Sequence, residues 1–219
     1  MIHTFNLGDL TYLVESVRWT LLLSLIAFVG GGGGGAVVAV LRISHRALPR
    51  SAAIAYIRLF QGTPLLLQLF IAFFLPSVVG IRVDPLIAAA IGLTLNASAF
   101  LGEIWRGCIE SIPKGQWEAA SALGVSYLLQ LRLIIMPQAV RVAIPPTVGF
   151  LVQLVKATSL AAIIGFTELT RAGQILINST FQPFLIFSII ATIYFLLCWP
   201  LSVLSTWLER RLAMQDAKA

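Results

Sequence analysis

Long runs without a charged side chain constrain this chain more than any other feature of its sequence. One run extends over residues 19–41, and comparably apolar runs follow it along the chain. A helix needs about 20 apolar residues to cross the hydrocarbon core of a bilayer. Only 11% of the residues are charged and 58% are hydrophobic, whereas a soluble domain carries about a quarter charged residues. A water-soluble fold of this composition would expose large apolar patches, so the sequence predicts an all-α membrane protein.

Five membrane-spanning helices are predicted from these runs. The last uncharged run is longer than one span requires, but its first half contains Asn178, Ser179, Gln182 and Pro183, so we expect a single helix in its second half. The predicted spans are 19–41, 59–81, 85–102, 142–164 and 184–207.

Basic residues are distributed unevenly among the segments that join the predicted spans. The segments after the first, third and fifth spans carry most of them: Arg42, Arg46, Arg50, Arg106, Lys114, Arg132, Arg141, Arg210, Arg211 and Lys218. The alternate segments carry Arg18, Arg82 and Arg171. The positive-inside rule then places the N-terminus outside and the C-terminus in the cytoplasm, which agrees with an odd number of spans. The long segment at about 108–143 is therefore predicted to be cytoplasmic.

Several function classes find little support in the sequence. The net charge of +6 reports orientation in a membrane chain rather than nucleic-acid binding. Cys108 and Cys198 are isolated, and His3 and His45 lie at a terminus and in a loop, so we expect no catalytic or metal cluster and no enzyme activity. A secondary transporter or channel is the alternative to weigh, although no inverted repeat and no ring of charges supports it.

Two local features inside the predicted spans have more than one interpretation. Gly30–Gly35 is a run of six glycines, each of which costs a helix in water about 1 kcal/mol relative to alanine. The run indicates either close helix contact of the small-xxx-small kind or a flexible weak point. Pro64 lies inside the second predicted span, where we expect it to kink the helix and free a carbonyl.

The cytoplasmic segment is predicted to contain two short helices. Residues 117–123 suit a helix that Gly124 stops, and Ser126 can cap a second helix that ends at Pro137. Periodicity alone is equally typical of an amphipathic segment lying in the lipid headgroups. Six residues at fixed spacing favour another interpretation, because their pattern resembles the signature loop of ABC importer permeases. These residues are Glu118, Ala119, Ala120, Gly124, Ile134 and Pro137.

The resemblance extends over roughly residues 18–212. The segments at 62–69, 103–115, 156–160, 168–171 and 208–212 are similar to the branch of ABC importer permeases that carries histidine, glutamine, glutamate, arginine and opines. It implies a type I permease fold formed by a single domain over residues 1–219, with its core at about 18–212 and its coupling loop at about 108–143. The location it implies is the bacterial inner membrane.

The family resemblance also implies partners and a mechanism. Such permeases pair with an identical or homologous permease, two cytoplasmic ATPases bind ATP-Mg beneath them, and a periplasmic binding protein delivers an amino acid. The chain itself lacks a GxxxxGKS motif and is expected to bind no ATP and no cofactor. The helix at Glu118 would lie in a cleft of the ATPase and transmit its motion to the spans. Glu118 would meet a basic ATPase residue or cap its own helix.

Polar groups within the predicted spans are candidates for the solute pathway. They are Asn96, Gln153, Lys156, Thr158 and Ser159. Glu103 and Arg106 are three residues apart and are better explained as a structural ion pair.

Two positions differ from residues common in the family. Gln61 replaces an arginine that many relatives have, and Ala157 replaces an acidic residue. The missing acidic residue removes a possible partner for a cationic side chain, which favours a neutral or acidic solute, or a partner permease that binds cations.

Overall fold

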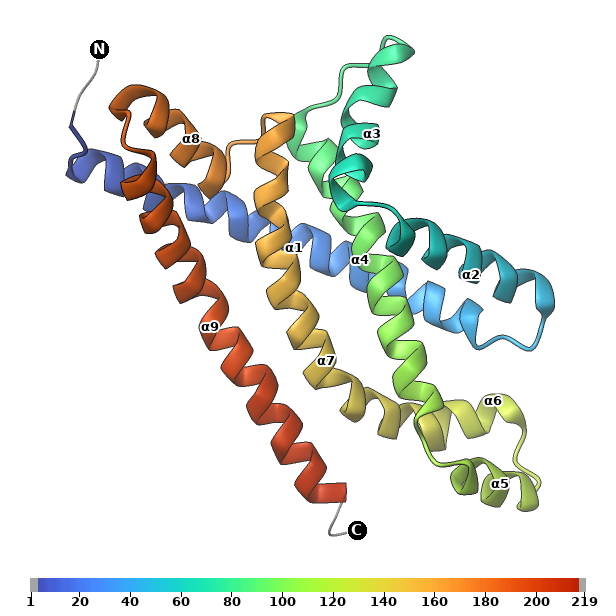
Figure 1. Ribbon diagram of the computed structural model, residues 1–219. Helices are drawn as coiled ribbons and strands as arrows, with labels where there is room; N and C mark the ends of the chain where they lie inside the picture. Colours follow the sequence, from blue (N-terminus) through green and yellow to red (C-terminus); the bar gives the residue numbers. More distant parts are fainter. Residues whose placement is uncertain (1–3, 217–219) are drawn as a thin grey trace.

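The computed structural model describes residues 4–216, and every regular element within them is helical (Figure 1). The elements are α1 (Leu7–Arg42), α2 (Ala47–Gly62), α3 (Leu65–Val78), α4 (Pro85–Glu110), α5 (Lys114–Ala122), α6 (Tyr127–Gln130), the π-helix η1 (Leu131–Ile135), α7 (Met136–Ala157), the 3-10 helix η2 (Thr158–Ile164), α8 (Leu169–Thr180) and α9 (Pro183–Asp216). The predicted all-α fold is confirmed, and His3 and Lys218 lie outside the described residues.

The long helices are arranged so that the two ends of the molecule differ. The start of α1 and α8 lie at one end, whereas α5, α6 and the end of α9 lie at the other (Figure 1). Helix α1 passes across α4, with which it makes the most extensive helix contact. The main core cluster includes Leu23, Leu93, Leu101 and Leu154 from α1, α4 and α7, and Leu69 of α3 and Ala161 of η2 complete it.

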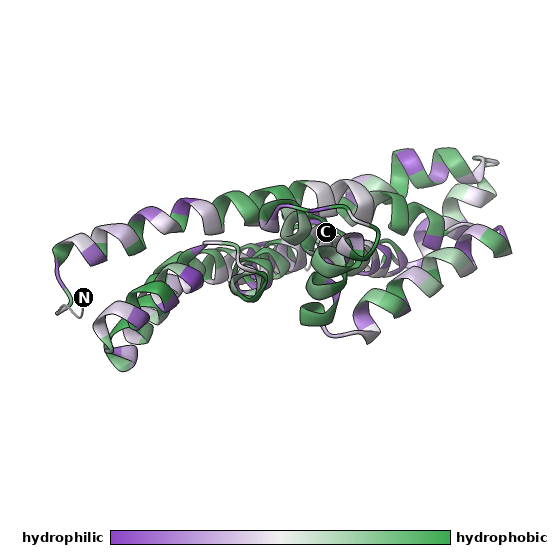
Figure 2. Cartoon of the chain, turned by 90° about the horizontal axis from the view of Figure 1, so that it is seen from above, coloured by the Kyte–Doolittle hydropathy of each residue, from purple (hydrophilic) through white to green (hydrophobic). Residues whose placement is uncertain are grey.

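Four helical segments of the described chain are long and apolar enough to cross a membrane: Leu7–Arg42, Pro85–Glu110, Tyr127–Ile164 and Pro183–Leu212. Helices α2 and α3 pass that test only together, and they are bent by 101° relative to each other. Apolar residues dominate long stretches of these helices (Figure 2). The chain is thus a multi-pass membrane protein, and the predicted count of five spans holds if the bent pair is one span.

The second predicted span, 59–81, is not one kinked helix as the sequence suggested. Helix α2 ends at Gly62 and α3 begins at Leu65, with Thr63 and Pro64 extended between them. Proline disfavours a helical conformation in the residue before it and supplies no N–H, so the helix ends rather than bends. The predicted free carbonyl is confirmed, and side chains satisfy it as described below.

The fourth span starts much earlier than the predicted residue 142. Helical structure continues from Tyr127 through Ile164, so Pro137 does not end the second loop helix as predicted. The reason is the π-helical turn η1, where the N–H of Met136 donates to the carbonyl of Leu131. A π-turn widens the helix locally, and this accommodates a proline that would clash in a regular α-helix.

The glycine run lies within an unbroken helix and makes the contact between α1 and α4 possible. A β-carbon on Gly35 would lie 2.9 Å from the β-carbon of Leu101 in α4. Gly30, Gly31 and Gly34 are equally tight against α4, whereas Gly33 has nothing within 4 Å. The close-contact interpretation is confirmed for these four glycines, and the weak-point interpretation is not, because α1 stays helical throughout.

Helix α8 was not predicted, and it is held by a buried carboxylate. Glu168 is fully buried and its Oε1 accepts backbone N–H groups of Thr170 (2.8 Å) and Arg171 (3.0 Å) at the start of α8. Its Oε2 accepts the hydroxyls of Tyr194 in α9 (2.7 Å) and Thr20 in α1 (3.4 Å). Burial raises the pKa of Glu168, and the hydrogen bonds oppose that shift.

Candidate coupling helix and solute cavity

The short helix α5 has well-defined ends. It covers Lys114–Ala122, three residues earlier at its start than predicted, and follows Pro113. At its other end Gly124 has a φ of +70°, and the N–H groups of Gly124 and Val125 donate to the carbonyls of Ser121 and Ala120. These two bonds form a Schellman motif, which requires the left-handed residue that glycine supplies. The prediction that Gly124 stops this helix is confirmed.

The residues of the EAA pattern face different environments on α5. Glu118 and Ala119 are exposed, whereas Ala120 is only 3% exposed and belongs to the internal packing of the chain. The Glu118 carboxylate does not cap α5, since that helix begins at a proline N-cap without a side-chain hydrogen bond. One of the two predicted roles of Glu118 is thereby removed.

Gln130 fixes the turn between α5 and α6. Its side chain is 6% exposed, and its Nε2 donates to the carbonyl of Val125 (2.6 Å) and the hydroxyl of Ser121 (3.1 Å). Ser126 begins α6 as predicted but makes no capping hydrogen bond with its side chain. The turn is therefore held by a glutamine whose role the sequence pattern did not reveal.

An apolar cluster attaches α5 to the spans. Ile109 at the end of α4 and Ile112 just after it pack with Ile135 and Ala139 from η1 and α7. The partly buried side chains of Ile43, Trp117, Leu131, Ile134 and Met136 surround this cluster. Ile134 of the signature pattern thus contributes to packing, and Pro137 is exposed on the first turn of α7.

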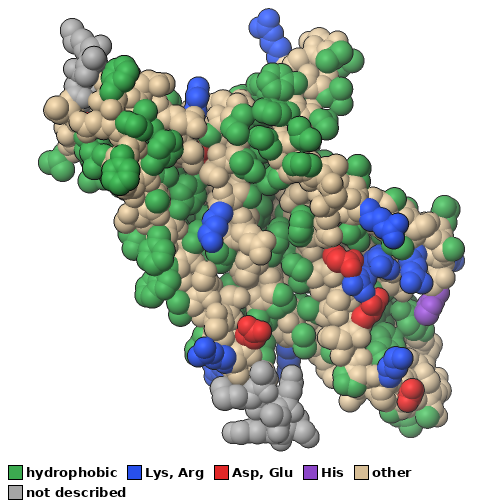
Figure 3. Space-filling model, in the orientation of Figure 1, with side chains coloured by type: hydrophobic (Ala, Val, Ile, Leu, Met, Phe, Trp, Pro, Cys, Tyr) green, Lys and Arg blue, Asp and Glu red, His purple; other side chains and the backbone are tan. Residues whose placement is uncertain are grey.

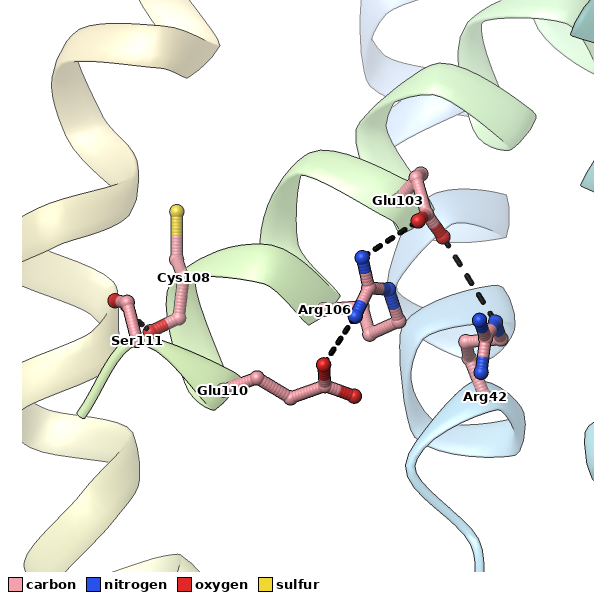
Figure 4. A network of polar contacts seen from close by, with 6 residues as sticks. All are labelled: Arg42, Glu103, Arg106, Cys108, Glu110 and Ser111. Carbon is pink, nitrogen blue, oxygen red and sulfur yellow. Dashed lines mark hydrogen bonds and ion pairs between the residues drawn. The ribbon is translucent and has the colours of Figure 1, made fainter. Parts of the chain in front are cut away.

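Glu103 links the ends of α1 and α4 near this cluster (Figure 4). Its Oε1 lies 2.6 Å from Nη2 of Arg106, its Oε2 lies 3.9 Å from Nε of Arg42, and Arg106 also pairs with Glu110. The predicted structural pair of Glu103 and Arg106 is confirmed. Arginine and acidic side chains gather on this side of the molecule in Figure 3. Arg42, Glu103 and Arg106 are half-buried, and only Glu110 is exposed, so the network ties the end of α1 to the last turns of α4.

A cavity of about 230 Å³ lies where the bent pair α2–α3 meets α4 and α7. It is lined by Phe60, Gln61, Thr63, Leu65, Asn96, Phe100, Phe150, Gln153, Leu154 and Ala157. The rings of Phe100 and Phe150 stack at 5.8 Å on one wall. The lining holds amides and a hydroxyl but no ionisable side chain.

Asn96 lines this cavity and also holds the break between α2 and α3. Its Nδ2 donates to Oε1 of Gln68 (3.0 Å) and to the carbonyl of Phe60 (3.4 Å). Gln68 Nε2 in turn donates to the carbonyls of Phe60 (2.8 Å) and Thr63 (3.1 Å). These are carbonyls that the break deprives of helical partners, and an unpaired carbonyl is costly in a membrane. Gln153, in contrast, is exposed and makes no side-chain hydrogen bond within the described residues.

The other three pathway candidates do not line the cavity. Lys156 is exposed one turn beyond Gln153. The hydroxyls of Thr158 and Ser159 donate to the carbonyls of Val155 and Lys156 within their own helix. Only Asn96 and Gln153 are therefore brought together at this site, and Phe60, Gln68 and Phe100 were missed because no local pattern marks them. Among residues 4–216 there is no group of three His, Cys, Asp or Glu that could hold a metal.

Comparisons with known proteins cover nearly the whole chain. The family described as "Binding-protein-dependent transport system inner membrane component" matches residues 15–214. The chain is 39% identical over 202 residues to the probable amino-acid ABC transporter permease protein YckA of Bacillus subtilis (strain 168), covering 92% of this chain and 89% of that protein. It is 36% identical over 202 residues to the glutamine transport system permease protein GlnP of Escherichia coli (strain K12), covering 91% and 92%.

Solved structures agree with these sequence relatives. The crystal structure of an amino acid ABC transporter with histidines superposes with a TM-score of 0.90 at 30% identity, covering 95% of this chain and all of that one (100%). An inward-facing MetNI methionine ABC transporter superposes with a TM-score of 0.78 at 19% identity, covering 95% of this chain and 99% of that one. The second similarity concerns the fold alone.

Proposed function

The chain belongs to the family of binding-protein-dependent transport system inner membrane components, and on that premise we propose that it is the membrane-spanning subunit of an ATP-driven importer of a polar, neutral amino acid. Its relatives are named as permeases of ABC transporters, which favours a transport subunit over an enzyme. They equally favour it over the secondary transporter or channel that the sequence left as the alternative.

The coupling role is supported by the structure of α5, which is a short helix with an exposed outer face and a fixed base. This helix projects at the same end of the molecule as the end of α9 (Figure 1), and it presents Glu118 and Ala119 outward. Its base is fixed by the Schellman turn at Gly124 and by the clamp of Gln130. A short rigid helix that is attached to the spans and exposed on its outer face can receive a rigid-body displacement from a partner and pass it on.

The partners follow from this assignment. A dimer of cytoplasmic ATPases, which bind ATP-Mg, would contact Glu118, Ala119 and the turn at Gly124. A second permease, identical or homologous, would complete the translocation path, and a periplasmic binding protein would deliver the solute. The N-terminus then lies outside and the C-terminus in the cytoplasm of the inner membrane, as the positive-inside rule predicts. The residues of the chain act as a single permease domain.

The solute class is inferred from the cavity between the bent pair, α4 and α7. No ionisable side chain lines it, and its lining includes Gln61 and Ala157, where a charged residue is expected from the family resemblance. Asn96 and Gln153 offer amide groups to polar solute atoms. Helix α3 begins at Leu65 on the cavity wall, and a helix N-terminus favours a carboxylate. These features suit a zwitterion with an uncharged polar side chain better than a cationic one.

The proposal is tested by measuring amino acid uptake by the complete transporter after the charge of one side chain on α5 is reversed. We expect Glu118→Lys to abolish ATP-dependent amino acid uptake while the protein still inserts and folds. Gln116→Lys places a positive charge at an exposed position of the same helix and serves as the matched control with near-normal uptake. Uptake driven by an ion gradient in vesicles that contain this chain alone would overturn the proposal.

A further inference from the structure

Three aromatic rings from three separate segments meet beside α5. The ring of Tyr127 stacks on Trp117 with centroids 5.8 Å apart and an interplanar angle of 20°. The ring of His45 meets the same tyrosine edge to face at 4.4 Å and 64°. We call these three residues the aromatic bracket. None of them belongs to the signature pattern of the loop.

Each ring of the bracket belongs to a different moving part of the proposed transporter. Trp117 lies in α5, and Tyr127 is the first residue of the helix that continues to Ile164. His45 lies in the short connection between α1, which ends at Arg42, and α2, which begins at Ala47. The bracket therefore joins α5 to α2 as well as to α7.

The apolar cluster beneath the bracket reinforces the same connection. Ile43, from the α1–α2 connection, packs against the cluster that Trp117 also contacts. Offset-stacked and edge-to-face rings hold a defined relative orientation, which aliphatic contacts do not. The apolar cluster thus holds the segments together, and the rings fix the angle between α5 and the α1–α2 connection.

Besides its lining residues from α4, the solute cavity has one wall at the end of α2 and another in α7, and the bracket joins α5 to both of these helices. Helix α2 ends at Gly62, next to the lining residues Phe60 and Gln61, and α7 carries the lining residues Gln153 and Ala157. A displacement of α5 that reached only α7 would move one wall. A displacement shared with α2 would move both walls together.

We propose that His45, Trp117 and Tyr127 are positioning residues that transmit motion of α5 into α2 in addition to α7, so that both walls of the cavity respond to one ATPase stroke. The inference rests on the proposed coupling function of α5. It adds a second route of transmission, through the α1–α2 connection. His45 is the residue of this connection whose ring contacts Tyr127.

The experiment compares ring-removing and ring-preserving substitutions in the complete transporter reconstituted in lipid vesicles. The readout is the number of ATP molecules hydrolysed per amino acid transported. We expect Tyr127→Leu and His45→Ala to raise that number severalfold, and Tyr127→Phe and His45→Phe to restore it to the wild-type value. Rescue by phenylalanine separates a requirement for the ring from a requirement for hydroxyl or charge.

A stacked pair elsewhere in the chain provides the matched control. Phe195 and Trp199 stack at 6.2 Å and 18°, but both lie within α9 and their contact joins no separate segments. We expect Phe195→Leu to leave the ratio of ATP to solute unchanged. An unchanged ratio of ATP to solute in Tyr127→Leu would overturn the inference that the aromatic bracket transmits motion. If Glu118→Lys also left transport unchanged, the coupling function itself would be wrong.

A distance measurement keeps the inference testable if Tyr127→Leu does not assemble. Spin labels at the exposed positions Gln116 in α5 and Leu48 in α2, with Cys108 and Cys198 replaced by alanine, report on the otherwise unaltered bracket. We expect the same distance with and without bound nucleotide, because the two helices move as one body. A distance that changes between the two states would contradict the inference.

Discussion

A β-carbon added to Gly31 of α1 would lie 2.5 Å from the β-carbon of Ala97 in α4. The two helices therefore touch almost backbone to backbone at this point. The contact continues along the helices, since Gly35 meets Leu101 and Val38 meets Gly102 one turn further on. Small residues at such spacing allow membrane helices to pack closely. Close packing matters there because the hydrophobic effect does not drive helices together in lipid.

The first prediction concerns this contact. Gly31→Ala should destabilise the chain by about 1–3 kcal/mol, because overpacking forces neighbouring side chains and backbone to shift. Gly33→Ala lies in the same glycine run with nothing within 4 Å, so it should not lower stability and gains the better helix propensity of alanine. Thermal unfolding of the two variants in detergent measures the difference. Equal melting temperatures would show that the glycine run does not act through the contact with α4.

The second prediction separates the two amides of the cavity. Asn96→Leu removes hydrogen bonds to Gln68 and to the Phe60 carbonyl, so it should lower stability by about 1–3 kcal/mol. Gln153→Leu breaks no hydrogen bond within the described residues and should leave the melting temperature unchanged. It should instead raise the KM for uptake by the complete transporter. The assignment of Gln153 to the pathway fails if its KM stays at the wild-type value.

The third prediction concerns the pH dependence of stability at Glu168. Burial raises the pKa of this carboxyl in the folded chain, so the folded state holds its proton more tightly than the unfolded state does. The resulting stabilisation is fully present below the ordinary carboxyl pKa of about 4.3 and is lost as pH rises through the raised folded value. As pH rises from the ordinary carboxyl pKa through the raised pKa of folded Glu168, the melting temperature of the wild type should therefore fall relative to that of Glu168→Gln.

A carboxyl on the surface controls for general pH effects in the same titration. Glu15 lies exposed on α1, and Glu15→Gln is measured over the same pH range as the reference for loss of one carboxyl. A constant difference between wild type and Glu168→Gln at every pH would mean that Glu168 has the same pKa in both states.

The fourth prediction addresses the clamp on α5. Gln130→Leu removes the hydrogen bonds to Val125 and Ser121 and should favour local opening of the turn by about 1–2 kcal/mol. Trypsin should then cleave after Lys114 roughly tenfold faster under native conditions. Gln116→Leu, at an exposed position of α5, should cleave at the wild-type rate. Equal rates for both variants would indicate that the Schellman turn alone holds the helix.

The sequence was sufficient where a local pattern carried the information. Uncharged runs indicated the membrane-spanning segments although not all of their bounds, the left-handed preference of glycine located the end of α5 at Gly124, and the spacing of Glu103 and Arg106 identified their ion pair. The glycine run left two interpretations open, because the choice depends on which residues of α4 lie opposite it. That information is a property of the packed pair and not of either helix.

The features that escaped prediction depend on partners far away in the chain. Glu168 is an unusual residue at a helix N-cap, and its contact with Thr20 bridges 148 positions in sequence. Gln68 became important only because Pro64 terminated α2 and left carbonyls within its reach. Pro137 was expected to end a helix, and the π-turn that accommodates it has no sequence signature of its own.

The absence of a break at Pro137 gives α7 the properties of a lever arm. Its residues Met136–Ala157 extend over about 33 Å at 1.5 Å per residue. A tilt of roughly 5° applied beside α5 would then displace Gln153 by about 2 Å and Ala157 by about 3 Å, which is comparable to the length of a hydrogen bond. A small angular stroke at the end of the molecule that carries α5 would thus suffice to make or break polar contacts in the cavity that Gln153 and Ala157 line.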